Sequence, residues 1–231
     1  MRLQVVVPYL AAPWCLEDLL ESFGASNVPV LVVDNSSESY CSDPRIPFPG
    51  NVEIVSHPEN IGASAAWNLG LERGADQTLI VSQWVRFSPM EHSRRPASWG
   101  LNHIARGIEQ RANAYGLTFG DQGYHLVCVG RRCVETIGTF DANLYFYGND
   151  DDYIRRQDLA GFRHAIPDWG SSGAYSVTFG ANKRGAHPVD AERTKVASDY
   201  YRRKWGPSFY DYTRPFNNPD NRLSYWPPVP E

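Results

Sequence analysis

The first 90 residues alternate apolar segments with segments of helical spacing. Strands are expected within residues 3–9, 28–37, 51–60 and 77–87, and the apolar runs of the first two are typical of strands buried on both faces of a sheet. Helices are expected at 13–24, with Pro13 near the start and Gly24 at the end, and at 62–75. This order predicts an α/β fold with a mostly parallel, doubly wound sheet flanked by helices. In such sheets, ligands bind beyond the carboxyl ends of the strands.

The second half of the chain adds further helices and then loses periodicity. We expect helices over residues 99–115, 150–162 and 191–205, and a strand followed by a short helix within 124–140. Beyond Gly206 the chain is rich in Pro, Asn and Tyr. We therefore expect one domain over residues 1–206, with halves at about 1–90 and 91–206, and a C-terminal extension over residues 207–231.

Composition and charge narrow the class of protein. The 231 residues are 42% hydrophobic and 21% charged, with a net charge of -4, which is ordinary for a globular protein and gives no sign of nucleic-acid binding. Cys15, Cys41, Cys128 and Cys133 form no CxxC pair, which indicates buried thiols in a reducing compartment. No segment has the length of a membrane span, so we expect a cytoplasmic protein.

Motifs of the common nucleotide-binding and hydrolytic enzymes are missing from the sequence. It contains no P-loop, no GxGxxG that opens a helix after a strand, no HExxH and no GxSxG. Their absence disfavours Walker-type kinases, Rossmann dehydrogenases, zincins and α/β-hydrolases.

Two turns and one acidic cluster carry candidate chemistry, each with a plain structural alternative. Asp34 ends a buried strand, where its carboxylate could bind a base or ribose or could close an Asx turn. Asn60 and Gly62 make a turn into a helix, whose amides could bind an anion or be capped internally. Three adjacent aspartates begin at Asp150, and they could form a catalytic site or simply cap a helix in solvent.

Taken together and in order, several segments resemble the family 2 glycosyltransferases with the GT-A fold. They are VVVPYL, LVVDNSS, PENIGASAAWNLGLERGA, a strand ending in FSP, IGTFDANLYFYGNDDDYIRRQDLAGFR and HPVDAERTKVASDYYRRKWG. The resemblance covers most of the chain to about Gly206. It implies inverting transfer of a sugar from a nucleoside diphosphate sugar, most simply a UDP-sugar, to an acceptor hydroxyl. The acceptor class stays open among a glycan, a lipid-linked sugar, a protein and a nucleic-acid base.

The resemblance also implies roles for individual residues. Asn149-Asp150 stands where the family has Glu-Asp, so Asp150 is the candidate general base. Asp152 is the second candidate acid of this catalytic block, and it matches an acid that has a structural role in the family. His187 matches a histidine that sometimes binds metal. In this scheme residues 1–90 bind the nucleotide and residues 91–206 supply the acceptor and catalytic half. The candidate donor-binding residues are Pro8, Tyr9, Asp34, Asn60, Gly62, Asn68, Trp84 and Arg156.

The expected metal motif is replaced. The family usually ends its fourth strand with acids just before SP, but here Ser82, Gln83 and Trp84 occupy those positions, and Trp cannot ligate Mg²⁺ or Mn²⁺. Three interpretations are open. In the first, the enzyme is metal-independent, and Arg86, Lys183 or Arg184 screens the charge of the diphosphate. In the second, it binds metal weakly through His187 and another acid. In the third, the protein has lost catalysis and still binds the sugar nucleotide.

A non-catalytic sugar-nucleotide or glycan-binding domain on the same fold is therefore the alternative function. One more segment has two interpretations. YYRRKWG, over residues 200–206, is expected to be a solvated helix face, and its aromatic and basic side chains could alternatively bind single-stranded nucleic acid.

Overall fold

The computed structural model describes residues 1–36, 41, 43, 47–89, 101–102, 104–105, 108, 117–119, 126–145, 147–162, 164–165, 175–179 and 191–206. His187, Lys183, Arg184 and the predicted extension at 207–231 lie outside these residues. The strands are β1 (Leu3–Tyr9), β2 (Val30–Asp34), β3 (Val52–Ser56), β4 (Gln77–Val81), β5 (Val85–Pro89), β6 (Leu117–Phe119), β7 (Leu126–Gly130), β8 (His164–Ala165) and β9 (Tyr175–Phe179). The helices are α1 (Pro13–Phe23), α2 (Ala63–Leu71), α4 (Arg131–Ile137), α5 (Asn149–Leu159) and α6 (Ala191–Trp205).

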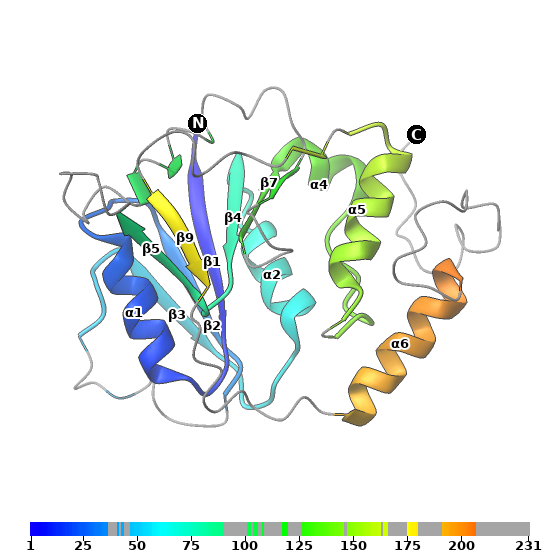
Figure 1. The fold of residues 1–231 in the computed structure, drawn as a ribbon, viewed down its shortest axis with the longest axis horizontal. Coiled ribbons are helices and arrows are strands. Elements are labelled where there is room, and N and C mark those ends of the chain that lie inside the picture. Colours follow the sequence, from blue (N-terminus) through cyan, green and yellow to red (C-terminus); the bar gives the residue numbers. More distant parts are fainter. Residues whose placement is uncertain are drawn as a thin grey trace.

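The main sheet has the predicted doubly wound arrangement. Its strand order is β3-β2-β1-β4-β7-β6-β8, and the first four strands run parallel to one another. β7 pairs antiparallel with β4, and β6 pairs antiparallel with β7. The mostly parallel sheet flanked by helices is thus confirmed, and Figure 1 shows helices on both of its faces.

The apolar run at 77–87 is two strands, so the prediction of one strand there was wrong. β4 ends at Val81, and β5 pairs antiparallel with β9 in a separate two-stranded sheet. The chain turns at Ser82–Trp84, where the Val85 amide donates to the Ser82 carbonyl at 3.0 Å. Buried Gln83 fixes this turn to the end of β1, because its side chain accepts from the Leu10 amide at 2.6 Å and donates to the Leu10 carbonyl at 3.1 Å. An apolar run alone does not reveal such a turn.

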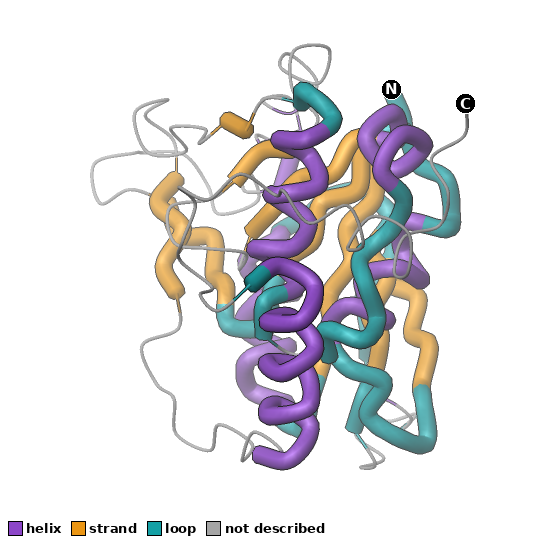
Figure 2. Tube along the Cα trace, turned by 90° about the vertical axis from the view of Figure 1, so that its right-hand side faces the viewer, coloured by secondary structure: helices purple, strands orange, loops and turns teal. Residues whose placement is uncertain are grey.

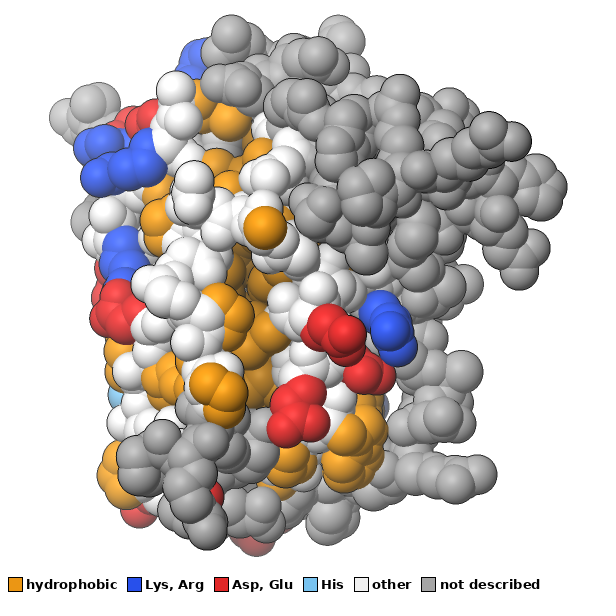
Figure 3. All heavy atoms as spheres, turned by 90° about the vertical axis from the view of Figure 1, so that its left-hand side faces the viewer, with side chains coloured by type: hydrophobic (Ala, Val, Ile, Leu, Met, Phe, Trp, Pro, Cys, Tyr) orange, Lys and Arg blue, Asp and Glu red, His pale blue; other side chains and the backbone are white. Residues whose placement is uncertain are grey.

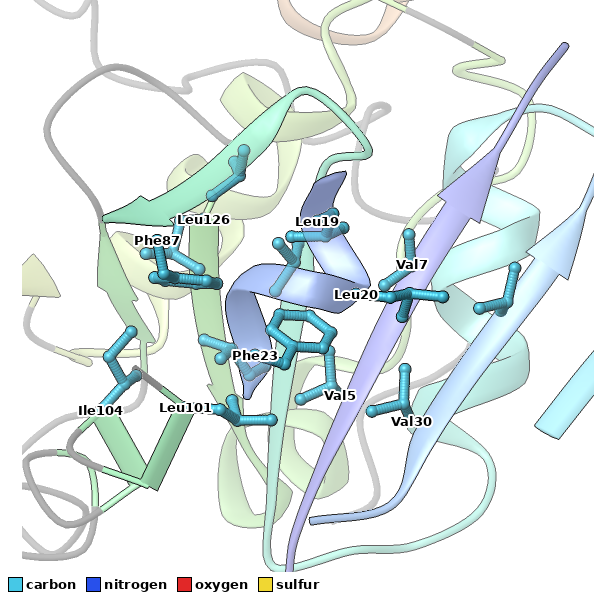
Figure 4. Close-up of a cluster of buried hydrophobic side chains, with 14 of the residues drawn as sticks. Val5, Val7, Leu19, Leu20, Phe23, Val30, Phe87, Leu101, Ile104 and Leu126 are labelled. Carbon is cyan, nitrogen blue, oxygen red and sulfur yellow. The ribbon is translucent and has the colours of Figure 1, made fainter. Parts of the chain in front are cut away.

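One face of the sheet packs against α1. Alternate residues of the buried strands point to this side, among them Val5 and Val7 of β1 and Val30 of β2. They meet Leu19, Leu20 and Phe23 of α1, as Figure 4 shows. The acidic side chains of α1 are exposed, and from the α1 side acidic and hydrophobic groups share the surface (Figure 3).

The opposite face packs against α2, α4 and α5. Val6, Leu31 and Val33 contact Ala66 of α2, and Ile80, Val127 and Val129 join a second cluster with Trp67, Cys133, Phe140 and Tyr153. α2 lies so close to β1 that a Cβ at Gly70 would collide with Val6. The four cysteines are buried thiols that form no disulfide, as predicted. Within the part of the chain described, no helix has the length and apolarity that crossing a bilayer requires.

Helices α2, α5 and α6 begin on the same side of the molecule. In Figure 1 their N-terminal ends lie toward the lower side, where β1 ends, and α6 lies beyond α5 at the end farthest from α1. Figure 2 views the molecule from that α6 end. The carboxyl ends of the parallel strands and the first turn of α5, which carries the three aspartates, therefore belong to one end of the fold.

Candidate functional site

The carboxyl ends of β1, β2 and β3 form a continuous edge. Tyr9 pairs with Asp34, and Asp34 pairs with Ser56. The pairing extends one residue further, because the Asn35 amide donates to the Tyr9 carbonyl and the His57 amide donates to the Asp34 carbonyl, both at 2.9 Å. Pro8 and Tyr9 lie at the end of β1, at one side of this edge, where the sequence places donor-binding residues. We call residues 8–9, 34–36 and 56–57 the strand edge.

Asp34 closes an Asx turn at the strand edge. Its Oδ1 accepts hydrogen bonds from the Ser36 amide at 2.9 Å and the Ser36 hydroxyl at 2.5 Å, and the residue is almost fully buried. The Cys41 thiol hydrogen-bonds the same carboxylate; burial, followed by the charge of Asp34, raises the pKa of Cys41. The Asx turn expected as the structural role of Asp34 is thus present in the fold, and it leaves open a second role for the carboxylate in binding a ligand.

At the strand edge, Oδ1 of Asn35 and Nε2 of His57 are buried without a hydrogen-bond partner. Each unsatisfied buried polar atom costs about 1–3 kcal/mol, so such atoms in a native fold call for an explanation. Neither residue was among the candidates predicted from the sequence. The available signal was position, since each lies one residue beyond a parallel strand.

The first amides of α2 are used within the protein. Gly62 donates to Oδ1 of Asn60 at 2.9 Å, and the Ala63 amide donates to the Tyr145 carbonyl at 3.0 Å. Tyr145 in turn donates its hydroxyl to the Asn60 carbonyl at 3.0 Å. Gly62 has φ +85°, and a Cβ there would stand 2.5–2.9 Å from Tyr145. This geometry matches the capping alternative and leaves the Gly62 and Ala63 amides no free capacity for an anion.

Asn68 has a similar internal role. Its side-chain amide donates to the Phe140 carbonyl and accepts from the Phe140 amide, both at 2.8 Å. One turn earlier, the Ser64 hydroxyl donates to the Leu144 carbonyl at 2.6 Å. The segment 140–145 is therefore fastened along α2, and this segment leads directly into the first turn of α5.

The position where the sequence resemblance implies a metal-binding acid holds a half-buried tryptophan. Trp84 lies in the turn after β4, with its amide 3.4 Å from the Ser82 hydroxyl. Of the residues proposed to screen the diphosphate, Arg86 lies in the described part of the chain. It is half-exposed, and its Nη1 lies 3.5 Å from Oδ2 of Asp18. Among the described residues, no three His, Cys, Asp or Glu side chains are grouped so that they could hold a metal ion.

The first turn of α5 presents Asp150 and Asp151 as half-buried carboxylates. Oδ1 of Asn149 accepts from the Asp150 amide at 3.0 Å, and Oδ1 of Asp150 accepts from the Asp151 amide at 2.9 Å. Nδ2 of Asn149 is buried and has no hydrogen-bond partner. Asp150 thus lies at a helix N-terminus, next to an unsatisfied donor, and keeps part of its surface accessible.

Asp152 is in a different environment from Asp150. Its side chain has no exposed surface. It accepts hydrogen bonds from Nε of Arg156 at 2.9 Å and from Nε1 of Trp205 at 2.7 Å, and it forms an ion pair with Nζ of Lys204 at 2.7 Å. Successive helical residues are rotated by about 100°, so Asp150 and Asp152 point in nearly opposite directions, about 160° apart around the helix axis. The structure therefore gives the two predicted catalytic acids different faces of α5.

Arg156 is also buried away from solvent. Its Nη1 donates to the Ile137 carbonyl at 2.7 Å and its Nη2 to the Thr139 carbonyl at 2.8 Å. With the ion pair to Asp152, these contacts occupy its Nε, Nη1 and Nη2 atoms, and the side chain is 2% exposed. Arg156 thus joins α5 to the end of α4 and to the loop that follows it, and its side chain has almost no exposed surface with which to bind a sugar donor.

Helix α6 brings an unexpected charge into this region. Lys204 is fully buried, between Asp141 at 2.6 Å and Asp152 at 2.7 Å. The Tyr200 hydroxyl donates to Asp141 at 2.7 Å. The prediction of a solvated face over residues 200–206 is right for Arg202 and Arg203, which are exposed, and wrong for Lys204. Charge counting along the sequence cannot show which of three adjacent cations turns inward.

Comparisons with known proteins identify the fold. No protein-family model matches the chain, and no curated protein matches it in sequence. Among solved structures, it is similar to S. aureus TarS residues 1–349 in complex with UDP-GlcNAc, with a TM-score of 0.51 and 12% identity over 88% of this chain and 72% of that one. It is also similar to GalNAc-T7 with UDP, GalNAc and Mn²⁺, with a TM-score of 0.55 and 11% identity over 91% of this chain and 50% of that one. The fold is that of the GT-A glycosyltransferases.

Proposed function

We propose that this protein transfers a sugar from a UDP-sugar to an acceptor hydroxyl, with inversion, and that the strand edge binds the nucleotide. One observation carries the proposal: a GT-A sheet leaves Asn35 Oδ1 and His57 Nε2 without partners at the edge where ligands of such sheets bind. Both atoms are shielded in the ligand-free chain, so binding includes a local rearrangement of side chains, as is common when partners meet. The structurally similar proteins were solved with UDP-GlcNAc and with UDP, which supports this class of donor.

Asp150 is the proposed general base. The acceptor oxygen attacks the anomeric carbon, its proton passes to the Asp150 carboxylate, and the bond between that carbon and the diphosphate oxygen breaks, releasing UDP. The partly accessible position of Asp150 suits this role, whereas the side chain of Asp152 is fully occupied by its three partners. We assign Asp152 and Arg156 to the support of α5.

We further propose that the diphosphate is handled without a divalent cation. Trp84 replaces the acid of the family, and the described residues offer no group of ligands. A cationic side chain can stabilise the charge that develops on the leaving diphosphate in place of a metal. Arg86 is a described candidate, and Lys183 and Arg184 are candidates from the sequence.

The test is a binding panel by thermal shift. We expect UDP, UDP-GlcNAc or UDP-GalNAc to raise the Tm, ADP and GDP to do so less, and Mn²⁺ to leave the shifts unchanged. Asn35→Leu is expected to weaken UDP binding about tenfold, the effect of losing one polar contact, without lowering the Tm of the free protein. Asn27→Leu, at an exposed position just before β2, is the matched control.

Two outcomes would count against parts of this proposal. No shift with any UDP compound would contradict the nucleotide site. A shift that appears only with Mn²⁺ would contradict the metal-independent diphosphate. Binding without any release of UDP from a donor would favour the alternative function, a sugar-nucleotide-binding domain that has lost catalysis.

A further inference from the structure

Four buried charged side chains near the contact of α5 and α6 are linked to one another by ion pairs, and we call this group the charge clasp. It consists of Asp141, Asp152, Arg156 and Lys204. Their side chains are between 0 and 7% exposed, and two positive charges balance two negative ones. Three chain segments contribute: the loop before α5, α5 itself and α6. The clasp therefore joins elements that are separated by up to 63 residues in sequence.

Lys204 occupies a core position of its helix. Ala197, Tyr200, Tyr201 and Lys204 follow the i, i+3, i+4, i+7 spacing of a buried stripe, and all four are buried. A lysine in such a stripe is rarely buried unless it is paired. Here its ammonium bridges two carboxylates and lies 5.5 Å from the centre of the Trp205 ring. The sequence thus places a cation where an aliphatic side chain would suffice to hold α6 against its neighbours.

The carboxylates that Lys204 bridges flank the candidate base on both sides in sequence. Asp141 lies in the loop fastened along α2, where its Oδ1 also accepts from the Asn143 amide at 3.0 Å. Asp152 lies two residues after Asp150 in the first turn of α5, and its amide donates to the Gly148 carbonyl at 2.9 Å. Lys204 therefore fixes the loop and the helical turn relative to each other, and residue 150 lies between the two fixed points.

We propose that Lys204 is a positioning residue, which holds the first turn of α5 and thereby aims Asp150 at the strand edge. The inference rests on the proposed function, because it concerns the base of that reaction. It assigns α6 a part in the site, although Lys204 itself has no exposed surface with which to touch a substrate. A displacement of about 1 Å at a catalytic group can lower a rate by about a hundredfold, so a distant clasp can control turnover.

The test separates positioning from mere stability by restoring charge balance. Lys204→Met leaves the clasp with one excess negative charge, and Lys204→Met combined with Asp141→Asn makes it neutral again. We expect the Tm to fall in the single variant and to recover in the double variant. We expect kcat for UDP release from the donor to fall at least about tenfold in both, with the donor KM unchanged. Lys195→Met, the same substitution on the exposed side of α6, is the control.

Recovery of kcat together with the Tm in the double variant would overturn the proposal, because Lys204 would then act on stability alone. Unchanged kcat in the single variant would overturn it as well. Amide hydrogen exchange over residues 149–153 provides a readout independent of activity: it should quicken in both variants while exchange in β1 and β2 does not change. If the wild-type protein releases no UDP, the proposed function fails. Unchanged exchange over residues 149–153 in both variants would refute the positioning role of Lys204 independently of that outcome.

Discussion

The strand edge and the charge clasp handle buried polar groups in opposite ways. At the clasp, four charged side chains are withdrawn from water and each is matched by an opposite charge within 2.9 Å. At the strand edge, Asn35 and His57 each keep a buried atom with no partner. Burying polar groups is costly in both places, but only the clasp offsets that cost within the fold. A bound ligand could therefore add hydrogen bonds at the strand edge, where buried polar atoms lack partners, but not at the clasp, where the charges are already paired.

The same contrast distinguishes the two acids of α5. We expect Asp152→Ala to lower the free energy of unfolding by about 3–5 kcal/mol. The substitution leaves buried Lys204 paired with Asp141 alone and removes the carboxylate that pairs with buried Arg156. We expect Asp150→Ala to change it by about 1 kcal/mol or less, since residue 150 is half-buried and not part of the clasp. Urea denaturation of both variants measures the difference. Equal losses would mean that the two carboxylates do not differ as the geometry indicates.

The glycine that precedes α2 offers a second test. Gly62 is the N-cap residue of α2 and faces Tyr145, which lies in the same loop as the clasp residue Asp141. We expect Gly62→Ala to destabilise the protein by about 2–4 kcal/mol, from the positive φ and from the collision with Tyr145 together.

Gly74 provides the matched control for this substitution. It has φ +67°, and a Cβ added there would meet no atom within 4 Å, so Gly74→Ala should lose only the backbone part, about 1 kcal/mol. Thermal unfolding of the two variants compares them directly. Similar losses would show that the contact between Gly62 and Tyr145 does not constrain the fold.

The smallest expected effect is a pH dependence of the clasp. Burial acts to raise the pKa of Asp141, but the charge of Lys204 and hydrogen bonds from Lys204 and Tyr200 outweigh it and hold the pKa below the ordinary 3.8. A depressed folded-state pKa contributes stability above the ordinary value, and this contribution disappears as the pH falls through the folded-state value. We expect stability to decline below about pH 4, and less steeply in Asp141→Asn. Acid titrations of the wild-type protein and of Asp141→Asn, followed by circular dichroism, compare the two declines. Identical slopes of stability against pH would show that Asp141 has no part in the decline.

The sequence was informative about the sheet and less so about the turns. Apolar runs predicted the parallel strands, and in β1, β2 and β4 burial on both faces leaves a continuous apolar signal in the chain. The division of 77–87 was missed, since the turn at Ser82–Trp84 depends on Gln83 contacting Leu10, a residue 73 positions away. Contacts between distant segments leave no local pattern.

The candidate site shows the same limit at the level of side chains. Position after a strand correctly located the edge at Tyr9 and Asp34, but it could not show that Asn35 and His57 would keep unsatisfied atoms. The expected crowding of three aspartates did not reveal that Asp152 turns inward to Lys204, because its partner arrives from another helix. The roles proposed for Asp150 and the donor-binding residues remain predictions.

Turnover of the Asp150→Asn variant tests the central claim most directly. The variant preserves size and hydrogen-bonding capacity but cannot accept the acceptor's proton. The measurement is the rate of UDP release from the UDP-sugar that gives the largest thermal shift, with UDP affinity determined in parallel. We predict a rate loss of about a hundredfold or more with nearly unchanged UDP affinity. An undiminished rate in this variant would contradict the account.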